Sequence, residues 1–427
     1  MKIVTIGLGY IGLPTSIMFA NHGQEVVGVD INPDVIAKLN EGQIHIEEPG
    51  LQEELERARV TRQFRASLDV ERADVFIVAV PTPNNDDALK SCNLDYVTDA
   101  VERVIPYLEQ GNTIIIESTI APKSTENVIL PMIEEAGFNV GTDVFLVHCP
   151  ERVLPGKIIH ELVHNNRIIG GVTPDCTLAG MNVYRTFVKG TLIPTKAATA
   201  ELSKLMENTF RDVNIALANE LVKISTELGI DALEVIDMAN EHPRVNLHQP
   251  GPGVGGHCLA VDPYFVAAVA PFQTPLIQQA RQINNSMPDF VIEQTRDIMA
   301  KIEGKKIAVF GLTYKGNIDD IRESPAMLIY EKLQLETSFE IVAYDPHVKR
   351  DFVEISRDQA LENADLVLIL TDHDVFKVLD QVSLMGMRQA VVFDTKNCIA
   401  SLDSSIEHIH FGNINSFRVD KEKMYSK

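Results

Sequence analysis

Short runs of apolar residues alternate with helix-like stretches along the first part of the chain. Five of these runs are of strand length and rich in β-branched residues: KIVTIG, EVVGVD, VFIVAVP, TIIIES and VFLVHCP. Such nearly continuous runs are typical of strands that are buried on both faces of a parallel sheet. Segments such as LPTSIMFANHG and YVTDAVERVIPYLEQG lie between them and predict helices that end at a glycine. The alternation predicts a doubly wound α/β domain over residues 1–195.

The middle of the chain follows a different pattern. Between Ala197 and Leu228 apolar residues recur at helical spacing, with no glycine or proline among them. This spacing predicts one long helix with a broad apolar face. More helix is expected up to residue 303, interrupted by the loop HPRVNLHQPGPGVGGHC, so residues 196–303 are assigned to a helical middle domain. The surplus apolar surface of the long helix suits a dimer interface or burial within its own chain.

The strand–turn–helix pattern restarts at KKIAVFG and continues through EIVAYD, ADLVLIL and AVVFD. A second, smaller α/β domain is therefore predicted over residues 304–427. Its closing stretch, VDKEKMYSK, is polar and is expected to fray. The expected fold is thus two Rossmann-like doubly wound α/β domains joined by a long central helix and a helical middle domain.

The charge balance narrows the range of partners. The 427 residues include 60 acidic and 38 basic side chains, for a formal net charge of −22. Because nucleic-acid affinity depends on clustered Lys and Arg, this balance argues against a nucleic-acid binder. A small anionic ligand is still compatible with it, since a helix N-terminus and a few local cations can hold one. No apolar run approaches the ~20 residues of a membrane span, and no basic leader precedes the first strand. A soluble cytoplasmic protein without membrane contact is expected.

A glycine motif follows the first strand. Gly7, Gly9 and Gly12 form GxGxxG between a strand and a helix. In this context the first glycine permits the tight turn, the second lets a pyrophosphate approach the backbone, and the third lets helix and strand pack closely. Asp30 ends the next strand, where its carboxylate can accept hydrogen bonds from both adenosine ribose hydroxyls. Because no Lys or Arg stands beside it in DINPD, NAD is favoured over NADP. The alternative is a glycine turn that binds nothing.

The second α/β domain keeps only part of this pattern. It has a first strand followed by Gly311, but GLTYKGN has lost the GxGxxG spacing, whereas Asp345 keeps the acidic position of the second strand. We expect a degenerate copy of the nucleotide fold that now binds something else. Lys315 and Arg322 are candidates for phosphate contacts, and the alternative is that both are solvated surface cations.

The cysteines are odd in number and widely spaced, and they contain no CxxC: Cys92, Cys149, Cys176, Cys258 and Cys398. This spacing predicts neither a disulfide framework nor a zinc site.

A glycine- and proline-rich loop leads to one of these cysteines. Six of the ten residues 250–259 are Gly or Pro, so the backbone can pass close to a ligand or a neighbouring loop. Cys258 ends the loop, with His257 beside it and Asp262 four residues on, as in a nucleophile presented at a turn. The alternatives are a buried Cys beside a helix start, and Cys149, which has His148 beside it but ends an apolar strand.

Two further polar clusters are candidates to meet the cysteine. Lys204 and Asn208 are four residues apart on the predicted long helix and share a face, where they could hold a developing oxyanion. An ordinary polar stripe has the same spacing. Glu151 in CPERVLPGK follows one sheet strand, and Glu117 and Thr119 close another. Doubly wound folds place their ligands at these strand ends.

Six motifs occur in order: GLGYIGLP, the strand end EST, CPERVLPGK, ELSKLMENTFRDVNIALANE, PGPGVGGHCLAVDP and GLTYKGNIDDIRESP. Together they resemble the UDP-glucose/GDP-mannose dehydrogenase family across nearly the whole chain. The motifs HPRVNLHQPGPGVGGHCLAVDP and CPERVLPGK look most like the bacterial branch that oxidises UDP-N-acetyl-D-mannosamine. The resemblance implies a four-electron oxidation of the sugar C6 alcohol to a carboxylate, with two NAD⁺ and one water, to give UDP-N-acetyl-D-mannosaminuronate.

The same resemblance implies a role for each chemical residue. Cys258 would trap the aldehyde as a thiohemiacetal, which becomes a thioester after the second oxidation. Lys204 and Asn208 would stabilise the oxyanion, and Lys204 is also a candidate for accepting the alcohol proton. Asp262 would position or activate the hydrolytic water, with Glu151 beside it. A covalent thioester keeps the reactive aldehyde from escaping between the two oxidations.

The resemblance also assigns sets of contacting residues and implies no metal. The catalytic set is Cys258, Lys204, Asn208, Asp262, Glu151 and Thr119. The cofactor set is Gly7, Gly9, Tyr10, Ile11, Gly12, Asp30, Thr82, Thr119 and Arg322. The substrate set is Glu151, Arg152, Val153, Leu154, Lys204, Asn208, Arg211, Arg244, His248, Gly255, Tyr314 and Lys315. Lys315 would hold the UDP part, and Arg244 would enter the neighbouring subunit's sugar site, which implies a homodimer or a higher homo-oligomer.

One departure from the family bears on the substrate. The glucose branch commonly has a Lys just before the aspartate of the cysteine motif, where this chain has Val261. This difference counts against UDP-glucose, although UDP-glucose and UDP-N-acetylglucosamine stay open as substrates of the same chemistry. Two other classes are also open: a two-electron hydroxyacid dehydrogenase without a catalytic cysteine, and a non-catalytic NAD-binding scaffold. A uronate product would suit the synthesis of a capsule or another surface polysaccharide.

Overall fold

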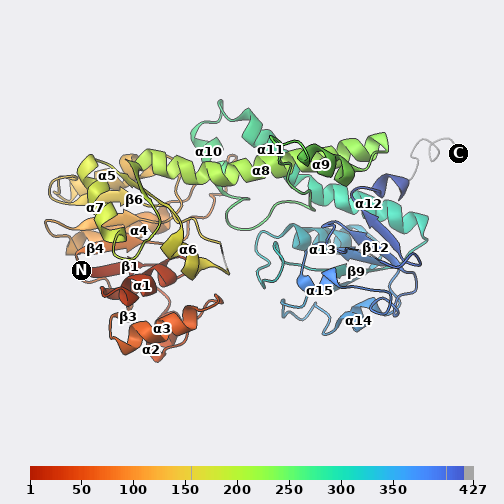
Figure 1. The fold of residues 1–427 in the computed structure, drawn as a ribbon, viewed down its shortest axis with the longest axis horizontal. Helices are drawn as coiled ribbons and strands as arrows, with labels where there is room; N and C mark the ends of the chain where they lie inside the picture. Colours follow the sequence, from red (N-terminus) through yellow and green to blue (C-terminus); the bar gives the residue numbers. More distant parts are fainter. Residues whose placement is uncertain (155, 401, 418–427) are drawn as a thin grey trace. The chain divides into compact units, whose positions relative to one another are not determined.

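The computed structural model describes residues 1–154, 156–400 and 402–417 (Figure 1). The chain divides into two compact units. The first comprises Met1–Glu207 and Tyr264–Gln273, and the second comprises Asn208–Pro263 and the chain from Thr274 onward. The closing stretch 419–427, which was expected to fray, lies outside the described residues.

The first unit is built on an eight-stranded sheet in the order β3-β2-β1-β4-β5-β6-β7-β8. The first six strands are parallel, in the order found in dinucleotide-binding Rossmann sheets. Strand β7 pairs antiparallel with β6 and parallel with β8. The strands are β1 (Lys2–Ile6), β2 (Glu25–Val29), β3 (Phe64–Ser67), β4 (Val75–Val78), β5 (Thr113–Ile116), β6 (Phe145–His148), β7 (Arg167–Gly171) and β8 (Leu192–Lys196).

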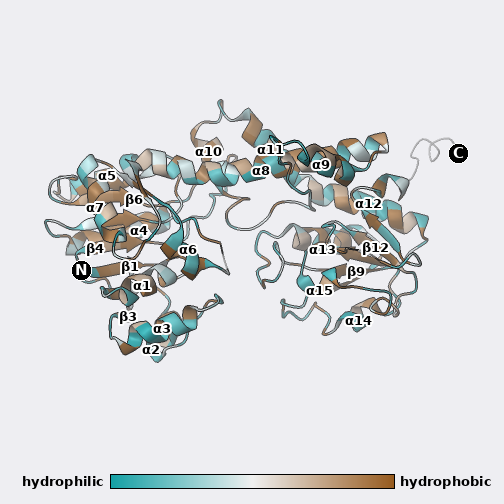
Figure 2. Cartoon of the chain, in the orientation of Figure 1, coloured by the Kyte–Doolittle hydropathy of each residue, from teal (hydrophilic) through white to brown (hydrophobic). Residues whose placement is uncertain are grey.

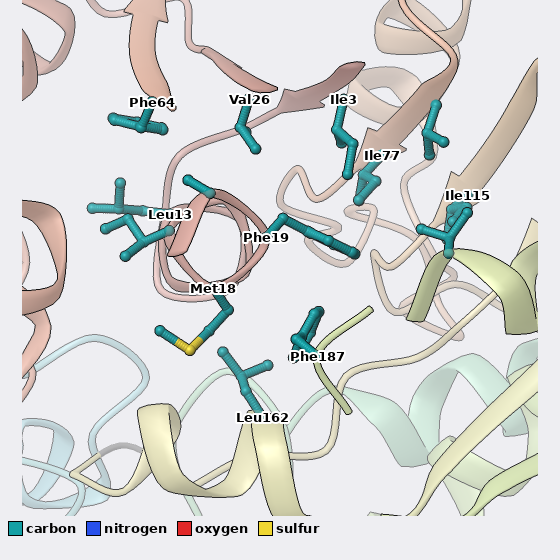
Figure 3. Close-up of a cluster of buried hydrophobic side chains, with 14 of the residues drawn as sticks. Ile3, Leu13, Met18, Phe19, Val26, Phe64, Ile77, Ile115, Leu162 and Phe187 are labelled. Atoms are coloured by element: carbon teal, nitrogen blue, oxygen red, sulfur yellow. The ribbon is translucent and has the colours of Figure 1, made fainter. Parts of the chain in front are cut away.

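Apolar side chains cover both faces of this sheet, as the continuous apolar runs predict. On one face Ile3, Val26 and Ile77 pack against Leu13 and Phe19 of the first helix, as Figure 3 shows. The helical segments are α1 (Gly12–Asn21), α2 (Pro33–Glu41), α3 (Leu51–Val60), α4 (Asp95–Val104), the 3₁₀ turn η1 (Ile105–Tyr107), the π turn η2 (Thr125–Ile129), α5 (Leu130–Glu135), α6 (Ile158–His164) and α7 (Pro174–Tyr184).

The helix expected over residues 96–111 is shorter in the structure. Helix α4 ends at Val104, and η1 follows it directly. The physical reason is Pro106, which has no backbone N–H to donate to the carbonyl oxygen four residues earlier, so the α-helical hydrogen-bond pattern stops there. The prediction of a single helix that runs to a glycine was therefore wrong at its C-terminal end.

The second unit contains a five-stranded, wholly parallel sheet in the order β10-β9-β11-β12-β13. The strands are β9 (Lys306–Phe310), β10 (Glu340–Tyr344), β11 (Leu366–Ile369), β12 (Val391–Asp394) and β13 (Glu407–His410). The helical segments outside the long central helix are α9 (Ala232–Asn240), α11 (Pro275–Asn285), α12 (Met287–Lys301), α13 (Pro325–Glu336), α14 (Arg357–Leu361), α15 (Asp374–Lys377) and η3 (Ile414–Phe417). Helix α10 (Asp262–Val269) begins in the second unit, and its residues from Tyr264 onward belong to the first. Both predicted Rossmann-like sheets and the helical middle region are thus present.

The long central helix α8 (Ala197–Leu228) has the predicted bounds and contributes residues to both units. Apolar and polar residues alternate along it (Figure 2). Four of its apolar side chains within the second unit are exposed in the single chain: Phe210 at 59%, Leu217 at 50%, Ile224 at 49% and Leu228 at 65%. Within the described part of the chain, no helix combines the length and the apolar character that a membrane crossing needs.

Candidate active site

The glycine turn between β1 and α1 is closely packed everywhere except at Gly9. Gly7 has a φ of +92°, and a Cβ there would lie 2.5 Å from the carbonyl oxygen of Ala79. A Cβ on Gly12 would lie 1.9 Å from the carbonyl oxygen of Gly7, so neither position accepts a side chain. A Cβ on Gly9, by contrast, would meet no described atom within 4 Å. The open backbone at Gly9, next to a helix N-terminus, fits the pyrophosphate of a dinucleotide.

Asp30 lies where β2 ends and is held against this turn. Its Oδ2 accepts a hydrogen bond from the backbone N–H of Leu8 at 3.0 Å, and its Oδ1 accepts one from Asn32 at 2.9 Å. The carboxylate remains only partly buried. It is therefore oriented by the turn and still open to a ribose, as a dinucleotide site requires. Tyr10 is exposed beside the turn, and Ile11 is the N-cap residue of α1.

The loops that follow β4 and β5 are tied together. Thr82 Oγ1 donates a hydrogen bond to the carbonyl oxygen of Thr119 at 2.6 Å. Ser118 Oγ donates to the carbonyl oxygen of Val80 at 2.8 Å and accepts from the Val80 N–H at 2.9 Å. Two residues that the family resemblance assigns to the cofactor thus meet at the carboxyl edge of the sheet.

A buried ionic network lies behind this edge, and sequence reasoning did not find it. Arg167 Nη1 donates to Glu117 Oε1 at 3.1 Å, and its Nη2 donates to Glu151 Oε2. Tyr184 donates from its hydroxyl to the same Glu117 oxygen at 2.5 Å. Burial raises the pKa of Glu117 to about 7, with the Glu151 charge adding to this and Arg167 opposing it. The only signal in the sequence was an arginine at the start of an apolar run, NNRIIGG.

The loop after β6 carries four residues predicted to bind the substrate. The backbone N–H of Arg152 donates to Glu151 Oε1 at 2.7 Å, and Arg152 Nη1 is paired with Glu207 at 2.5 Å. Val153 is partly buried, and Leu154 is exposed. The guanidinium of Arg152 is therefore engaged within the first unit.

The first turns of α8 are fixed to the first unit by Glu201. This buried carboxylate accepts hydrogen bonds from the N–H and hydroxyl of Thr125, at 2.8 and 2.6 Å, and from the N–H of Lys123 at 2.5 Å. Lys204 follows less than one turn later and is also buried. Burial and the Lys204 charge lower the pKa of His148 to about 3, so this imidazole stays neutral. Lys204 is thus close to the end of β6.

In the second unit the structure brings three predicted catalytic residues together. Asn208 Nδ2 donates to Asp262 Oδ2 at 2.6 Å. The backbone N–H of Asp262 donates to the carbonyl oxygen of Cys258 at 2.9 Å. Asn208, Asp262 and Cys258 therefore form a local cluster at the start of α10, whereas Lys204, Glu151 and Thr119 belong to the first unit.

The cysteines, all within the described residues, differ sharply in exposure. Cys258 is exposed, Cys149 and Cys176 are buried, and Cys92 and Cys398 are intermediate. Burial raises the pKa of Cys149 to about 12, and burial with nearby Asp394 also raises the pKa of Cys398. Because the thiolate is the nucleophile, Cys149 is a poor alternative to Cys258.

The glycine-rich loop before Cys258 packs tightly against a loop of the second sheet, one of the two outcomes that its composition allows. A Cβ on Gly255 would lie 2.3 Å from the carbonyl oxygen of Glu323 and 3.0 Å from Tyr314 Cβ. Gly256 has a φ of +84°, and its Cβ would lie 2.7 Å from the Tyr314 ring. Gly255 and Tyr314, both predicted to bind the substrate, are therefore in contact, and no larger residue fits at either glycine.

The two ends of this loop are anchored to helices. The N–H of Gly251 donates to Asn219 Oδ1 of α8 at 2.9 Å. Arg281 Nη1 of α11 lies 3.5 Å from the carbonyl oxygen of Leu259, and the same atom pairs with buried Asp212 at 2.6 Å. These anchors, none of which sequence reasoning predicted, tie the loop that carries Cys258 to α8 and α11.

His257 and Arg322 both turn to Asp320. His257 Nε2 lies 3.7 Å from Asp320 Oδ2, and Arg322 donates to both oxygens of Asp320, at 2.9 and 2.8 Å. Burial lowers the pKa of His257, and the Arg322 charge lowers it further. The His257 imidazole, next to Cys258 in the sequence, is therefore directed toward the Asp320 carboxylate.

The remaining predicted substrate residues lie at the surface of the second unit. Arg211, Arg244 and Lys315 are exposed. His248 packs edge-on against Phe210, with ring centroids 6.1 Å apart.

Asp345 has the same position in the second Rossmann-like sheet as Asp30 in the first, but its carboxylate is enclosed by other residues of the chain. Its Oδ2 accepts from the Leu312 N–H at 2.8 Å and lies 3.1 Å from His373 Nε2, while its Oδ1 accepts from the His347 N–H. The carboxylate is buried. It cannot reach a ribose as Asp30 can, in keeping with a degenerate copy of the fold.

Comparisons with known proteins identify the family of the chain. Three family models match in order: the NAD binding domain of the UDP-glucose/GDP-mannose dehydrogenase family over residues 1–188, its central domain over 198–286, and its UDP binding domain over 308–401. A UDP-N-acetyl-D-mannosamine dehydrogenase of Methanocaldococcus jannaschii is 45% identical over 405 residues, 93% of this chain and 92% of the relative. An NDP-N-acetyl-D-galactosaminuronic acid dehydrogenase of Ralstonia nicotianae is 43% identical over 410 residues, 92% of this chain and 95% of the relative.

Among solved structures, the UDP-N-acetyl-mannosamine dehydrogenase Cap5O of Staphylococcus aureus is 58% identical with a TM-score of 0.92, covering 98% of this chain and 100% of its own. Fold, site and comparisons define an NAD-dependent oxidoreductase with a separate nucleotide-binding domain for its substrate. The chain belongs to the UDP-glucose/GDP-mannose dehydrogenase family. The predicted family, fold class and NAD cofactor are thereby confirmed.

Proposed function

We propose that this chain oxidises the C6 alcohol of UDP-N-acetyl-D-mannosamine to the carboxylate in two successive two-electron steps. The observation that carries this proposal is the cluster of exposed Cys258 with Asn208 and Asp262. Such a cluster provides a nucleophile, an oxyanion donor and a carboxylate in one place. The substrate is supported by the names of relatives 45% and 58% identical over most of the chain, and by Val261 in place of the lysine of the glucose branch.

The residues of the first unit fit the dinucleotide. Gly9 leaves the backbone open for the pyrophosphate, and Asp30 offers its carboxylate to the ribose. Thr82 and Thr119 lie at the carboxyl edge of the sheet. When bound, NAD⁺ supplies the electron acceptor, and two molecules are reduced for each sugar. The overall balance is alcohol, two NAD⁺ and one water to carboxylate, two NADH and three protons.

Cys258 holds the intermediate between the two oxidations. Its sulfur attacks the C6 aldehyde, a C–S bond forms, and the carbonyl oxygen becomes an oxyanion. The second N–H of the Asn208 amide and the ammonium of Lys204 stabilise that charge. Oxidation of this thiohemiacetal gives a thioester. Water then attacks the thioester carbon, with Asp262 and Glu151 orienting the water or accepting its proton, and the C–S bond breaks to release the uronate and the thiolate.

We extend the proposal to the assembly and its setting. The exposed residues of α8, from Phe210 to Leu228, form an apolar stripe that suits a second copy of the chain. Arg244 lies in an exposed segment from which it could enter the partner's sugar site. We therefore propose a cytoplasmic homodimer or higher homo-oligomer whose uronate product serves a capsule or another surface polysaccharide. Its functional segments are 1–195 for NAD, 196–303 for dimerisation and the cysteine loop, and 304–427 for the UDP part.

The test is the number of NADH molecules formed per UDP-sugar consumed, with excess NAD⁺. UDP-N-acetylmannosamine, UDP-N-acetylglucosamine, UDP-N-acetylgalactosamine and UDP-glucose are compared in parallel. Two NADH per UDP-N-acetylmannosamine, with little turnover of the others, is the expected result. Preference for another sugar would correct the substrate only. One NADH with a free aldehyde would exclude Cys258 as the acyl carrier, and NAD binding without any NADH would favour a non-catalytic scaffold.

A further inference from the structure

The side chain of Arg167 is almost wholly buried between two carboxylates. One arm of its guanidinium binds Glu117 at 3.1 Å and the other binds Glu151. Behind it the Tyr184 ring lies 4.5 Å from the guanidinium carbon, and the Tyr184 hydroxyl donates to the Glu117 oxygen that Arg167 also binds. Two acids therefore share one cation and one phenol inside the first unit.

Stability does not account for this arrangement. Bringing ionised groups into a protein interior costs several kcal/mol per ion by the usual order-of-magnitude estimate, and a buried pair is often no more stable than apolar residues of the same volume. The set is also incomplete, since Glu117 Oε2 has no hydrogen-bond partner among the described residues. A positioning role would explain why an arginine lies here.

The antiparallel pairing of β6 and β7 brings the two groups together. His148 lies opposite Gly170 in that pairing. Three residues beyond His148 is Glu151, and three residues before Gly170 is Arg167. Continuing the register thus places Arg167 opposite Glu151, just past the carboxyl end of β6. A parallel β7 would not do this, because its first residue would lie at the opposite edge of the sheet.

Two hydrogen bonds fix the orientation of the Glu151 carboxylate. Its Oε2 accepts from Arg167, and its Oε1 accepts from the backbone N–H of Arg152 at 2.7 Å. Both carboxylate oxygens are therefore directed by donors of the first unit. The planar guanidinium directs one N–H group to Glu117 and another to Glu151 in fixed directions, whereas a lysine ammonium is a compact charge whose donors rotate on a flexible stem.

We propose that Arg167 is a positioning residue, braced by Glu117 and Tyr184, that fixes the Glu151 carboxylate for the hydrolysis of the Cys258 thioester. The inference rests on the proposed function, because it requires Glu151 to act on the hydrolytic water. It predicts that the network matters at the last step and not at the two oxidations that precede it.

The test is Arg167→Lys in the full-length enzyme with NAD⁺ and UDP-N-acetylmannosamine. The first turnover is followed by rapid mixing and the steady state by NADH absorbance. We expect two NADH per site to form at a rate within about threefold of the parent. Steady-state turnover should fall about 10- to 100-fold, because the Glu151 carboxylate is misplaced for hydrolysis. Mass spectrometry should then show the acyl group accumulating on Cys258. Arg185→Lys, the same change at an exposed position on the residue after Tyr184, is the matched control.

The outcomes separate the two proposals. A parent enzyme that makes one NADH per sugar, or never acylates Cys258, would overturn the proposed function whatever Arg167 does. If the parent makes two NADH, then a parallel fall of first turnover and steady state in Arg167→Lys, or no change in either, would overturn the positioning role. Should Arg167→Lys fail to fold, Glu117→Leu decides, since it removes only the brace. In Glu117→Leu, a slower steady state with an unchanged first turnover supports the positioning role. An unchanged steady state overturns it.

Discussion

Asn208 donates a hydrogen bond to Asp262 over 2.6 Å, although 54 residues separate them in the sequence. Asp262 in turn donates its backbone N–H to the carbonyl oxygen of Cys258. The long helix, the start of α10 and the end of the glycine-rich loop are thus joined by two hydrogen bonds. Because an amide nitrogen carries two hydrogens, Asn208 is oriented by Asp262 and keeps a second N–H for an oxyanion.

Asn208→Asp should therefore impair chemistry without impairing NAD binding. The change removes the donor and sets a second carboxylate against Asp262, so kcat should fall about 100- to 1,000-fold, as for loss of an oxyanion donor. Steady-state kinetics and NAD⁺ titration measure the two effects. Asn214→Asp, on the same helix, is the control, because the Asn214 amide donates to the Phe210 carbonyl one turn earlier. Equal losses in both variants would mean that charge on α8, and not the donor, is responsible.

Replacing Cys258 by Ala should abolish uronate formation while the fold is retained. The exposed thiol is the proposed acyl carrier, and no other thiol is placed to replace it, since Cys149 is buried with a pKa of about 12. Product analysis of NADH and uronate measures the effect, and circular dichroism checks the fold. Cys398→Ala is the control and should keep two NADH per sugar. Unchanged turnover of Cys258→Ala would instead favour a two-electron hydroxyacid dehydrogenase.

The pattern of the sequence predicted those elements whose residues are uniformly buried or regularly spaced. Helix α8 has the predicted bounds because its apolar spacing is unbroken over 32 residues. Strands β1, β2, β4, β5 and β6 are buried on both faces, so their apolar runs were continuous. By contrast β8 is mostly exposed, and β3 alternates between buried and exposed residues, so neither was recognised.

The site was predictable only where a motif carries the chemistry locally. The GxGxxG turn and the cysteine loop are contiguous, and Gly7, Gly12, Gly255 and Gly256 mark positions that a Cβ cannot occupy. The Arg167 network is not contiguous, since its carboxylates lie 50 and 16 residues away and meet only through the reversal of β7. The Arg281–Asp212 pair joins α11 to α8 across 69 residues of sequence. Nothing in local composition indicates such pairings.

Asp30→Ala should lower NAD⁺ affinity, because it removes the ribose acceptor and frees the Leu8 N–H that orients the turn. We expect the Kd for NAD⁺ to rise about 10-fold or more, the loss of one or two hydrogen bonds to a charged group, with weaker discrimination against NADP⁺. Isothermal titration calorimetry with both dinucleotides measures this. The matched control is Asp345→Ala, which removes a sealed carboxylate and should lower stability with little change in the Kd. An equal rise in the Kd for both variants would contradict the different roles of the two positions.

The buried Glu117 should give the protein a pH-dependent stability of known sign. Its pKa is raised by burial from 4.5 to about 7, so between these values the folded chain holds a proton that the unfolded chain has released. Stability from this group is therefore fully present below pH 4.5 and is lost as the pH rises through 7, with a slope of at most about 1.4 kcal/mol per pH unit. Glu117→Gln keeps the oxygen that accepts from Arg167 and Tyr184 but cannot ionise.

Glu117→Gln should thus gain stability relative to the parent as the pH rises from 5 to 8. The midpoint of thermal unfolding, recorded for both proteins at each pH, measures the difference directly. His148, whose pKa burial lowers to about 3, makes stability fall as the pH drops below 6.5, but it is present in both proteins and cancels in the comparison. Glu135→Gln, at an exposed position, should show no such trend. If the difference between parent and Glu117→Gln stayed constant over this range, Glu117 would not be the group that holds an extra proton in the folded chain.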